Sequence, residues 1–554
     1  MTETIIIKFN DGTTKEYPKN ISCLNIIEDK IGKNNYSVVA VKINNMLTRI
    51  DEPIKKSCDL TFLDRTTKDG HEVYIRGLKY IFIKAVKDVL GYNTNVVIEH
   101  SIDKGIYCEI EAALSEEIVS KIEKRMVDIV EEDLPFKRVM VNRHEAIEYF
   151  KKINRIDKSD ALKYVIETNI ILYQLGNLYD YFYGEMPLST KYVDKFKLSY
   201  VSTEGVILRF PTIYSPNSIP EYTERKKIFD VFREYSGWSK IIGVNHAPDL
   251  NKKITEGNAT EIIKISELAQ NNKLNTIANE IYEKRDKIKI VLIAGPSSSG
   301  KTITSHKLSY YLKSKGLNPT PIGLDNYFVE RVDNPRDEEG NYDYETIDAI
   351  DIKLFNDQLT KLLNNEEVVL PEYNFLTGEK EYKDNKLKLK ENDILIIEGL
   401  HGLNEKLTSS ISRDNKYKLY VSPLTVLNID NHNRISTSFV RKIRRLVRDY
   451  KYRGYGAIET MEMWEKVREG EEKHVFPFQD EADAIFNTAL SYELSILKIY
   501  AEPLLFSVTE DSVYFDEARR MIKFLKNFLP ISADDIPDDS LIREFIGGSK
   551  IINN

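Results

Sequence analysis

Residues 291–302 of the chain read VLIAGPSSSGKT. The apolar run Val291–Ala294 predicts a buried strand, and residues 295–302 match the spacing G-x-x-x-x-G-K-[ST] of a phosphate-binding loop. Gly295 and Gly300 allow backbone torsions that turn successive N–H groups toward phosphate oxygens. After the loop, His306–Leu312 predict a helix whose positive N-terminal dipole faces the same phosphates.

This loop predicts where a nucleotide and its metal ion bind. Lys301 brings a positive charge to the β- and γ-phosphates, and Thr302 offers a hydroxyl to Mg²⁺. A chance turn rich in glycine and serine is the alternative, which the strand before the loop and the helix after it disfavour. The expected nucleotide-binding residues of the loop are Gly295, Pro296, Ser297, Ser298, Ser299, Gly300, Lys301 and Thr302.

The composition limits the class of protein. The chain has 554 residues, of which 42% are hydrophobic and 30% charged, which predicts a soluble protein of three or four domains. A net charge of -8 argues against a molecule built as a whole to neutralise nucleic acid, although local basic patches remain open. The three cysteines form no C-x-x-C pair, as expected of a reduced cytoplasmic protein. We expect no membrane span and no secretion signal.

Residues 1–64 predict a small β-rich domain. Strands are expected over Thr4–Phe9 and Thr13–Tyr17 around an Asn-Asp-Gly turn, followed by a helix over Leu24–Ile31 and strands over Ser37–Ile43 and Asp59–Phe62. This order resembles the TGS domain, the β-grasp module at the front of threonyl-tRNA synthetases. The motifs that carry the resemblance are Asp11-Gly12-Thr13, Tyr17-Pro18 and Val41-Lys42-Ile43-Asn44.

Residues 65–225 form the next predicted unit. Ser115 is a predicted helix N-cap, after which Ile118, Ile122, Met126 and Ile129 share one helical face. The stretches 114–136 and 141–146 resemble the editing domain of threonyl-tRNA synthetases.

The chemistry of that editing domain is expected to be lost. The family holds zinc or processes the mischarged ester with an H-x-x-x-H pair and a later Cys and His. Here His71 is followed four residues on by Ile75, and the Cys and His positions fall on Phe182 and Met186. One nitrogen ligand cannot hold a zinc ion that requires four ligands. We therefore expect a non-catalytic binding or scaffold domain, which leaves contact with RNA open.

Residues 226–286 predict a helical connector, and residues 287–554 a kinase-like domain. From 287 on, strands alternate with helices, which predicts a parallel sheet, so the overall fold class is multidomain α+β and α/β. Ligands of such sheets bind at the carboxyl ends of strands. Asp325 ends one predicted strand and is a candidate proton acceptor or metal organiser, with a helix or turn cap as the alternative that its position alone favours. Glu398 ends the apolar run 394–397, and its carboxylate would meet the Mg²⁺ shell.

Four arginines follow at helical spacing, and this motif leaves two interpretations open. Arg441, Arg444, Arg445 and Arg448 share one broad helical face, so they can close over a transferring phosphoryl group. A solvated or RNA-binding basic helix is the alternative.

Together, these motifs resemble the uridine kinase and phosphoribulokinase family of P-loop kinases. The resemblance implies ATP and Mg²⁺ as cofactors and Asp325 as the catalytic base. It also implies Lys301, Arg445 and Arg448 as catalytic cations, Arg453 as a nucleotide contact, and Thr302 and Glu398 as metal ligands. The residues implied for the acceptor are Tyr327, Asp343, Tyr373 and Arg441, with Asp343 on ribose hydroxyls and Tyr373 in the 371–375 segment at the base.

The chain departs from the family in its acceptor pocket. The histidine that reads a pyrimidine falls on Gly378, the Asp after Tyr373 is Asn374, and the last arginine of the lid motif is Tyr455. A missing buried donor weakens substrate discrimination. The complete order of domains resembles a bacterial group of nucleoside kinases, whose R-E-F-I-G-G-S tail is residues 543–549 here. For this tail we expect an interdomain or site-covering role.

We therefore expect a kinase that phosphorylates the 5′-hydroxyl of a nucleoside, with uridine and cytidine as the first acceptors to test. Two alternatives stay open: an RNA- or ribosome-associated ATP-dependent regulator, and a kinase for a purine nucleoside, a sugar or an RNA end. The absence of an N-K-x-D motif argues against a GTPase. The sequence leaves the choice of ATP or GTP and homo-oligomerisation open.

Overall fold

The computed structural model describes residues 3–337, 340–374 and 376–552, so Phe375 of the expected base-pocket segment lies outside the described residues. The chain folds as two compact units. The first comprises Met1–Lys252, Val426–Ser436 and Leu505–Leu529, and the second comprises Lys253–Thr425, Thr437–Leu504 and Pro530–Asn554. Two segments of the predicted kinase-like domain thus belong to the first unit, which no sequence pattern indicated.

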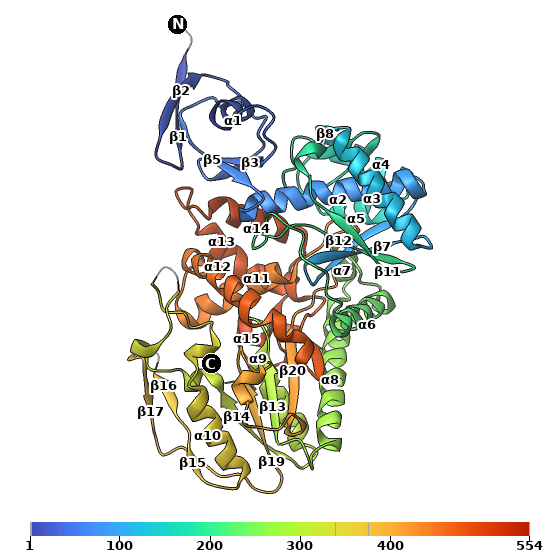
Figure 1. Cartoon of the computed structure of the whole chain (residues 1–554). Helices are drawn as coiled ribbons and strands as arrows, with labels where there is room; N and C mark the ends of the chain where they lie inside the picture. Colours follow the sequence, from blue (N-terminus) through green and yellow to red (C-terminus); the bar gives the residue numbers. More distant parts are fainter. Residues whose placement is uncertain (1–2, 338–339, 375, 553–554) are drawn as a thin grey trace. The chain divides into compact units, whose positions relative to one another are not determined.

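The first unit opens with a five-stranded mixed sheet and one helix (Figure 1). Its strand order is β2-β1-β5-β3-β4, with β1 antiparallel to β2 and parallel to β5. The strand over Thr4–Phe9 is confirmed, and β4 is a short strand that the sequence analysis missed. The elements are β1 (Thr4–Phe9), β2 (Thr14–Pro18), α1 (Cys23–Ile31), β3 (Val38–Ile43), β4 (Met46–Thr48) and β5 (Cys58–Asp64).

The rest of the first unit packs helices on two antiparallel sheets. The sheets have the orders β11-β12-β7-β6 and β10-β9-β8. The strands are β6 (Val96–Ile102), β7 (Gly105–Ile110), β8 (Lys137–Asn142), β9 (Asn169–Leu175), β10 (Leu178–Asp180), β11 (Lys197–Ser202) and β12 (Gly205–Arg209). The helices are α2 (Lys68–Leu90), α3 (Glu116–Glu131), α4 (Arg143–Lys152), α5 (Ile156–Lys163), α6 (Lys226–Ile242), α7 (Ala247–Thr255) and α14 (Phe515–Leu525).

Helix α3 illustrates how local sequence fixes an element of this unit. The Ser115 side chain accepts the Ile118 N–H at 3.3 Å, so the predicted N-cap is confirmed. The buried face consists of Val119, Ile122, Met126 and Ile129, whereas Ile118 is only half-buried. The predicted face is therefore correct except at its first position, where Val119 replaces Ile118.

The second unit is built on a five-stranded parallel sheet, as predicted. Its order is β14-β19-β13-β20-β21, and every neighbouring pair is parallel. The strands are β13 (Ile290–Ala294), β14 (Asn318–Gly323), β19 (Asp393–Glu398), β20 (Lys416–Ser422) and β21 (Ala484–Asn487). All five residues of β13 are buried, because both faces of a parallel sheet are covered.

Helices and two small two-stranded sheets complete the second unit (Figure 1). Helix α9 packs on β13, β14 and β19, and α8 packs on α9. The helices are α8 (Ala259–Glu283), α9 (Lys301–Lys313), α10 (Ile352–Leu363), α11 (Thr437–Arg453), α12 (Ala457–His474), α13 (Glu493–Phe506) and α15 (Arg543–Ile546). One two-stranded sheet pairs β15 (Val368–Val369) with β18 (Lys386–Leu387), and the other pairs β16 (Glu372–Asn374) with β17 (Glu379–Glu381). Nowhere in the described ranges is a helix both long and apolar enough to span a membrane.

A buried charge network ties the segment Val426–Ser436 into the first unit. The Lys158 ammonium, which is fully buried, lies 2.9 Å from Asp180 and 3.0 Å from Asp430. His432 hydrogen-bonds Asp180 through Nδ1, and Asn433 donates to the Tyr181 carbonyl at 2.9 Å. Burial alone would raise the pKa of Asp180, but Lys158 and His432 more than offset this and hold it well below its usual range. The network therefore depends on Asp180 remaining ionised.

The variant Asp180→Asn tests this network. It removes the negative charge that Lys158 and His432 share, so we expect a loss of about 3–5 kcal/mol in the free energy of unfolding. The measurement is urea denaturation followed by Trp238 fluorescence, in a Trp464→Phe background so that only the first unit reports. The control is Asp160→Asn, whose partly exposed ion pair with Lys163 is worth about 1 kcal/mol or less. Equal losses in both variants would contradict the assigned role of Asp180.

Candidate functional site

The loop between β13 and α9 has the backbone that phosphate binding requires. Ser298 and Gly300 have positive φ angles of 57° and 90°. A side chain at Gly295 would collide with the Val421 carbonyl, and a Cβ at Gly300 would lie 2.7 Å from Leu541 Cδ2. Both glycines therefore allow neighbouring segments to pack closely against the loop.

Neighbouring segments brace this loop from outside. The Thr488 hydroxyl, which follows β21, donates to the Ser299 carbonyl at 2.6 Å. Among the described residues, the Ser298 and Ser299 hydroxyls are buried and have no hydrogen-bond partner. Buried polar groups without partners are costly. The loop is therefore held in place by Thr488, and the two serine hydroxyls can still donate hydrogen bonds. Such donors fit an anionic ligand.

Lys301 and Thr302 begin α9 and meet the end of β19. The Lys301 ammonium is half-buried and donates to the Pro296 carbonyl at 3.2 Å. The Thr302 hydroxyl lies 3.0 and 3.2 Å from the two Glu398 carboxylate oxygens. Hydroxyl and carboxylate oxygens are the ligands that Mg²⁺ prefers. These two residues thus fit a magnesium site, as the motif predicts.

The Glu398 carboxyl has an altered acidity. Burial raises its pKa to about 7, with smaller contributions from Glu544 and Asp325, whereas Lys301 opposes the shift. Because a metal ligand must be deprotonated, a metal ion held by Glu398 would bind with an affinity that depends on pH near neutrality.

Asp325 follows β14, the strand beside β19. In the register, Gly323 pairs with Glu398 and Ile293 also pairs with Glu398, so three strands end at the same edge. The Asp325 side chain is open to solvent, and desolvation by the surrounding protein raises its pKa against the opposing effects of Lys301 and Arg453. A carboxylate with a raised pKa beside a lysine is suited to accept a proton.

The residues predicted to bind the acceptor substrate differ in their burial and contacts. The Tyr327 ring is buried, and its hydroxyl donates to Gln358 at 2.8 Å, so it is engaged within the core. The buried Tyr373 ring packs edge-on against Phe328 at 5.6 Å between centroids. Asp343 accepts the Glu345 N–H at 3.0 Å and remains half-buried.

Arg331 lies beside the position of the expected pyrimidine-reading histidine. Gly378 has a φ of 81°, and a Cβ there would lie 2.6 Å from the Arg331 Cβ. The Arg331 N–H donates to the Gly378 carbonyl at 2.9 Å, and its guanidinium donates to the Leu376 carbonyl at 3.3 Å. A guanidinium thus lies beside Gly378, where the family resemblance leads us to expect an imidazole.

The arginines of α11 divide between two tasks. Arg441 donates to the Ser297 carbonyl at 2.8 Å and pairs with Glu471, and Arg445 donates to the Ser297 hydroxyl at 2.9 Å. These two side chains reach the phosphate-binding loop. Arg444 instead pairs with Glu493 at 2.5 Å and donates to the Thr488 carbonyl at 2.8 Å.

The Asp449 carboxylate pairs with three arginines of this helix. Its fully buried carboxylate lies 3.1 Å from Arg445, 2.7 Å from Arg448 and 3.6 Å from Arg453. Shared among three guanidinium groups, Asp449 holds Arg445, Arg448 and Arg453 together near the loop. This cluster of cations is the group that the sequence assigned to phosphoryl transfer and nucleotide contact.

Two carboxylates at the loop were missed by the sequence analysis. Glu471 accepts the Ser297 N–H at 2.8 Å and lies on α12, in a run of charged residues that is typical of a solvated helix face. Glu544 accepts the Ile303 N–H at 3.3 Å from the C-terminal segment. Only the unusual R-E-F-I-G-G-S composition around Glu544 signalled that this segment has a specific role.

In the first unit, the positions that the editing family uses for metal and ester chemistry are filled by apolar side chains. Phe182 and Met186 are buried in the hydrophobic core, and Ile75 packs against it. His71 is half-buried, with its ring 6.0 Å from Phe210, and burial lowers its pKa to about 4. No group of three or more potential ligands for a metal ion occurs within residues 3–337, 340–374 and 376–552.

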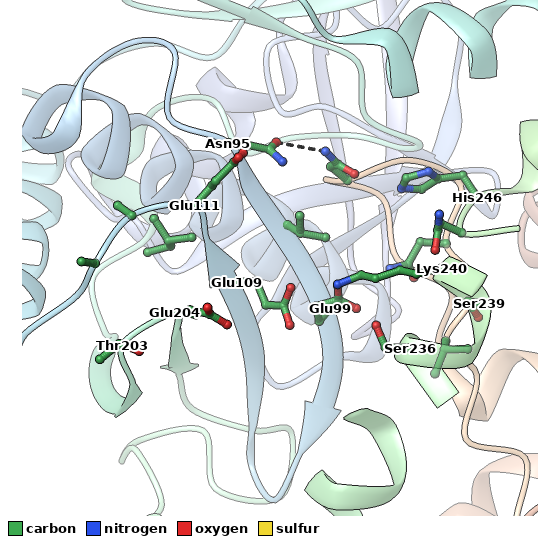
Figure 2. Close-up of a pocket in the computed structure, with 18 residues that line it drawn as sticks. Asn95, Glu99, Glu109, Glu111, Thr203, Glu204, Ser236, Ser239, Lys240 and His246 are labelled. Carbon is green, nitrogen blue, oxygen red and sulfur yellow. Dashed lines mark hydrogen bonds between the residues drawn. The ribbon is translucent and has the colours of Figure 1, made fainter. Parts of the chain in front are cut away.

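The first unit also contains a cavity of about 590 Å³ (Figure 2). Its wall carries the carboxylates Glu99, Glu109, Glu111 and Glu204 together with Lys240 and His246. Burial raises the pKa of Glu99 to about 7, and the nearby Glu109 adds to the shift. The Asn431 side chain donates to Asn95 at 3.0 Å at its edge. So acidic a wall is unfavourable for the phosphate groups of RNA.

The geometry of the second unit agrees with a comparison to protein families. Residues 290–494 match the Phosphoribulokinase / Uridine kinase family. The matched range contains the loop, Asp325, Glu398 and the α11 arginines.

The N-terminal region resembles a different class of protein. Threonine–tRNA ligases match about 200 residues: that of Carboxydothermus hydrogenoformans is 29% identical over 35% of this chain and 31% of its own length. That of Clostridioides difficile is 30% identical over 36% of this chain and 31% of its own length. The chain thus spans about a third of the length of these curated relatives.

Two solved structures with low sequence identity and low TM-scores to this chain are of proteins named as kinases. A structure titled "a Possible Uridine Kinase" from Bacillus stearothermophilus is 20% identical, with a TM-score of 0.27 over 39% of this chain and 98% of that chain. A D-glycerate 3-kinase from Cryptococcus neoformans is 16% identical, with a TM-score of 0.21 over 46% of this chain and 88% of that chain. Likenesses at these scores carry no inference about this protein.

The raised pKa of Glu398 gives a testable pH dependence. With a pKa of about 7, the carboxyl is mostly protonated at pH 6 and mostly ionised at pH 8. We therefore expect the affinity for ATP in the presence of Mg²⁺ to rise about tenfold over this range. In Glu398→Gln the affinity should be lower, and only the titration of ATP itself should remain in the pH profile. Calorimetric titrations at several pH values measure this, and parallel profiles for both proteins would contradict the assignment.

Proposed function

We propose that the protein is a P-loop kinase that transfers a phosphoryl group from ATP to the 5′-hydroxyl of a nucleoside. The observation that carries this proposal is the convergence of Lys301, Glu398 and Asp325 at the carboxyl ends of three neighbouring strands. Their residue types supply a cation for phosphate, a carboxylate for metal and a carboxylate for a proton.

The proposed roles follow from these positions. Residues 295–302 hold the phosphates of ATP, and Thr302 and Glu398 hold Mg²⁺, which supplies positive charge to the phosphate oxygens. Asp325 accepts the proton of the acceptor hydroxyl as the new bond to phosphorus forms. Lys301, Arg445 and Arg448 stabilise the charge that spreads over the transferring group, and Arg453 contacts the nucleotide.

Uridine and cytidine are the first candidates for the nucleoside that accepts the phosphoryl group. In this proposal Asp343 binds the sugar and Tyr373 contacts the base. Arg441, assigned to the acceptor from the resemblance, is buried against Glu471 and the loop, which supports a role in bracing the loop as well. Because Arg331 lies where a pyrimidine-reading histidine is expected, purine nucleosides and sugars belong in the same screen.

A second candidate function rests on the likeness of the N-terminal region to threonine–tRNA ligases. In this proposal the first unit contacts RNA and ATP drives a regulatory switch. A steep dependence of RNA binding on salt concentration would support it. The acidic cavity of the first unit and the loss of the editing residues weigh against it.

The kinase proposal is tested by incubating the full chain with MgATP and a panel of nucleosides and identifying monophosphates by mass spectrometry. In Asp325→Asn we expect kcat to fall by roughly 10²–10⁴-fold, as loss of a general base predicts, with ATP affinity within about twofold.

The matched control is Asp333→Asn, an exposed carboxylate eight residues along the chain, which should leave kcat unchanged. An Asp325→Asn enzyme with the kcat of the unmodified protein would remove Asp325 from the role of base.

A further inference from the structure

Residues 541–547, which read LIREFIG and are called the tail segment below, lie within the second unit and are largely buried. The side chains of Leu541, Glu544, Phe545 and Ile546 are each at most 8% exposed. A carboxylate buried to this extent at the end of a chain requires a partner.

The partner of Glu544 is the start of the P-loop helix. Its Oε2 atom accepts the N–H of Ile303, the third residue of α9, at 3.3 Å. Leu541 approaches the same turn, since a Cβ at Gly300 would lie 2.7 Å from its Cδ2 atom. The first amides of a helix have no partner within the helix and are therefore its anion-binding groups. Glu544 thus occupies one of the amides that a nucleotide phosphate would use.

The tail segment also contacts the arginine-bearing helix α11. The Arg444 guanidinium lies 5.0 Å from the centre of the Phe545 ring, and Lys451 donates to the Ile546 carbonyl at 2.6 Å. Helix α15, which forms the centre of the tail segment, packs on α11. The segment is therefore joined to both sides of the phosphate site.

The tail segment and the residue before it are fixed to the body of the unit. Ser540 donates to Glu267 of α8, which also accepts the Tyr492 hydroxyl at 2.6 Å. Within the tail segment, Arg543 donates to the carbonyls of Ala533 and Ile536 at 2.9 and 2.7 Å. Because these bonds hold the approach to residue 544, the contact of Glu544 with α9 is a defined feature of the fold.

We propose that the tail segment competes with the nucleotide: the Glu544 carboxylate takes the place of a phosphate oxygen at the start of α9, and binding of ATP displaces it. The proposal rests on the proposed function for the identity of the ligand. Two negative charges at one helix N-terminus repel each other, so displacement is the favourable outcome once Mg²⁺-bound triphosphate arrives. Through Phe545 and Lys451, the same movement releases a restraint on α11.

The variant Glu544→Gln tests the competition. Glutamine keeps the size and a hydrogen-bond acceptor but removes the charge, so the Kd of MgATP should fall by roughly 2- to 30-fold, the range that a charge at a helix N-terminus is worth. Inorganic tripolyphosphate should bind more tightly by the same factor, because the competition concerns phosphates. Calorimetry on the full chain measures both ligands.

Two further variants make the test specific. Asp538→Asn removes an exposed tail carboxylate that pairs with Lys550 at 2.5 Å, and it should leave both Kd values within about twofold. Lys451→Ala removes the bond to the Ile546 carbonyl, loosens the tail segment and should also lower the Kd of MgATP. An unchanged or raised Kd in Glu544→Gln, or a change for ATP but not for tripolyphosphate, would overturn the proposal.

Hydrogen–deuterium exchange separates this proposal from the proposed function. Saturating MgATP should speed exchange at the amides of residues 541–547 in the unmodified protein. Release of these amides without phosphorylation of any nucleoside would overturn the proposed function alone. Phosphorylation of a nucleoside while these amides stay protected would overturn the competition alone.

Discussion

Concentrated positive charge at the start of α9 is the constraint on which the second unit depends. Lys301, the first amides of the helix and the arginines of α11 all lie around residues 295–303. Four carboxylates from different segments offset this positive charge. Asp325 follows one strand of the sheet and Glu398 ends another, whereas Glu471 lies on α12 and Glu544 near the C-terminus. Acidic side chains from four segments thus offset the positive charge at this site.

This balance explains why the arginines of α11 are not equivalent. Arg441 and Arg445 reach the loop at Ser297, whereas Arg444 supports the loop indirectly, through Thr488 and Glu493. Buried guanidinium groups need paired acceptors, and each of the three has one within the described residues. The helix therefore both contributes charge to the site and holds the loop in shape.

Sequence patterns predict the parts of this site that depend on local order. The loop, the helix after it, and the strand that ends at Glu398 follow from apolar runs, glycines and motif spacing, and the structure forms each of them. The partners of Arg441 and Arg444 could not be predicted, because Glu471 and Glu493 come from distant segments and resemble ordinary surface charges. The contact of Glu544 with α9 could not be predicted for the same reason.

The first unit shows a second limit of sequence reasoning. The substitution of Phe182 and Met186 at the editing positions predicted the loss of metal chemistry, and both side chains lie in the core. No local pattern indicates that Asp430 and His432, from the segment Val426–Ser436, complete a network with Lys158 and Asp180. This segment continues directly into α11 at Thr437, so the two units are not continuous stretches of the sequence.

The kinase proposal requires that the phosphoryl group of ATP pass directly to an acceptor hydroxyl. This transfer is measured by supplying ATP labelled with ¹⁸O in its γ-phosphoryl group, together with Mg²⁺ and nucleosides, and following the label by mass spectrometry. Direct transfer predicts a nucleoside 5′-monophosphate that carries the labelled phosphoryl oxygens. Label found only in free phosphate would identify an ATPase and would contradict direct transfer.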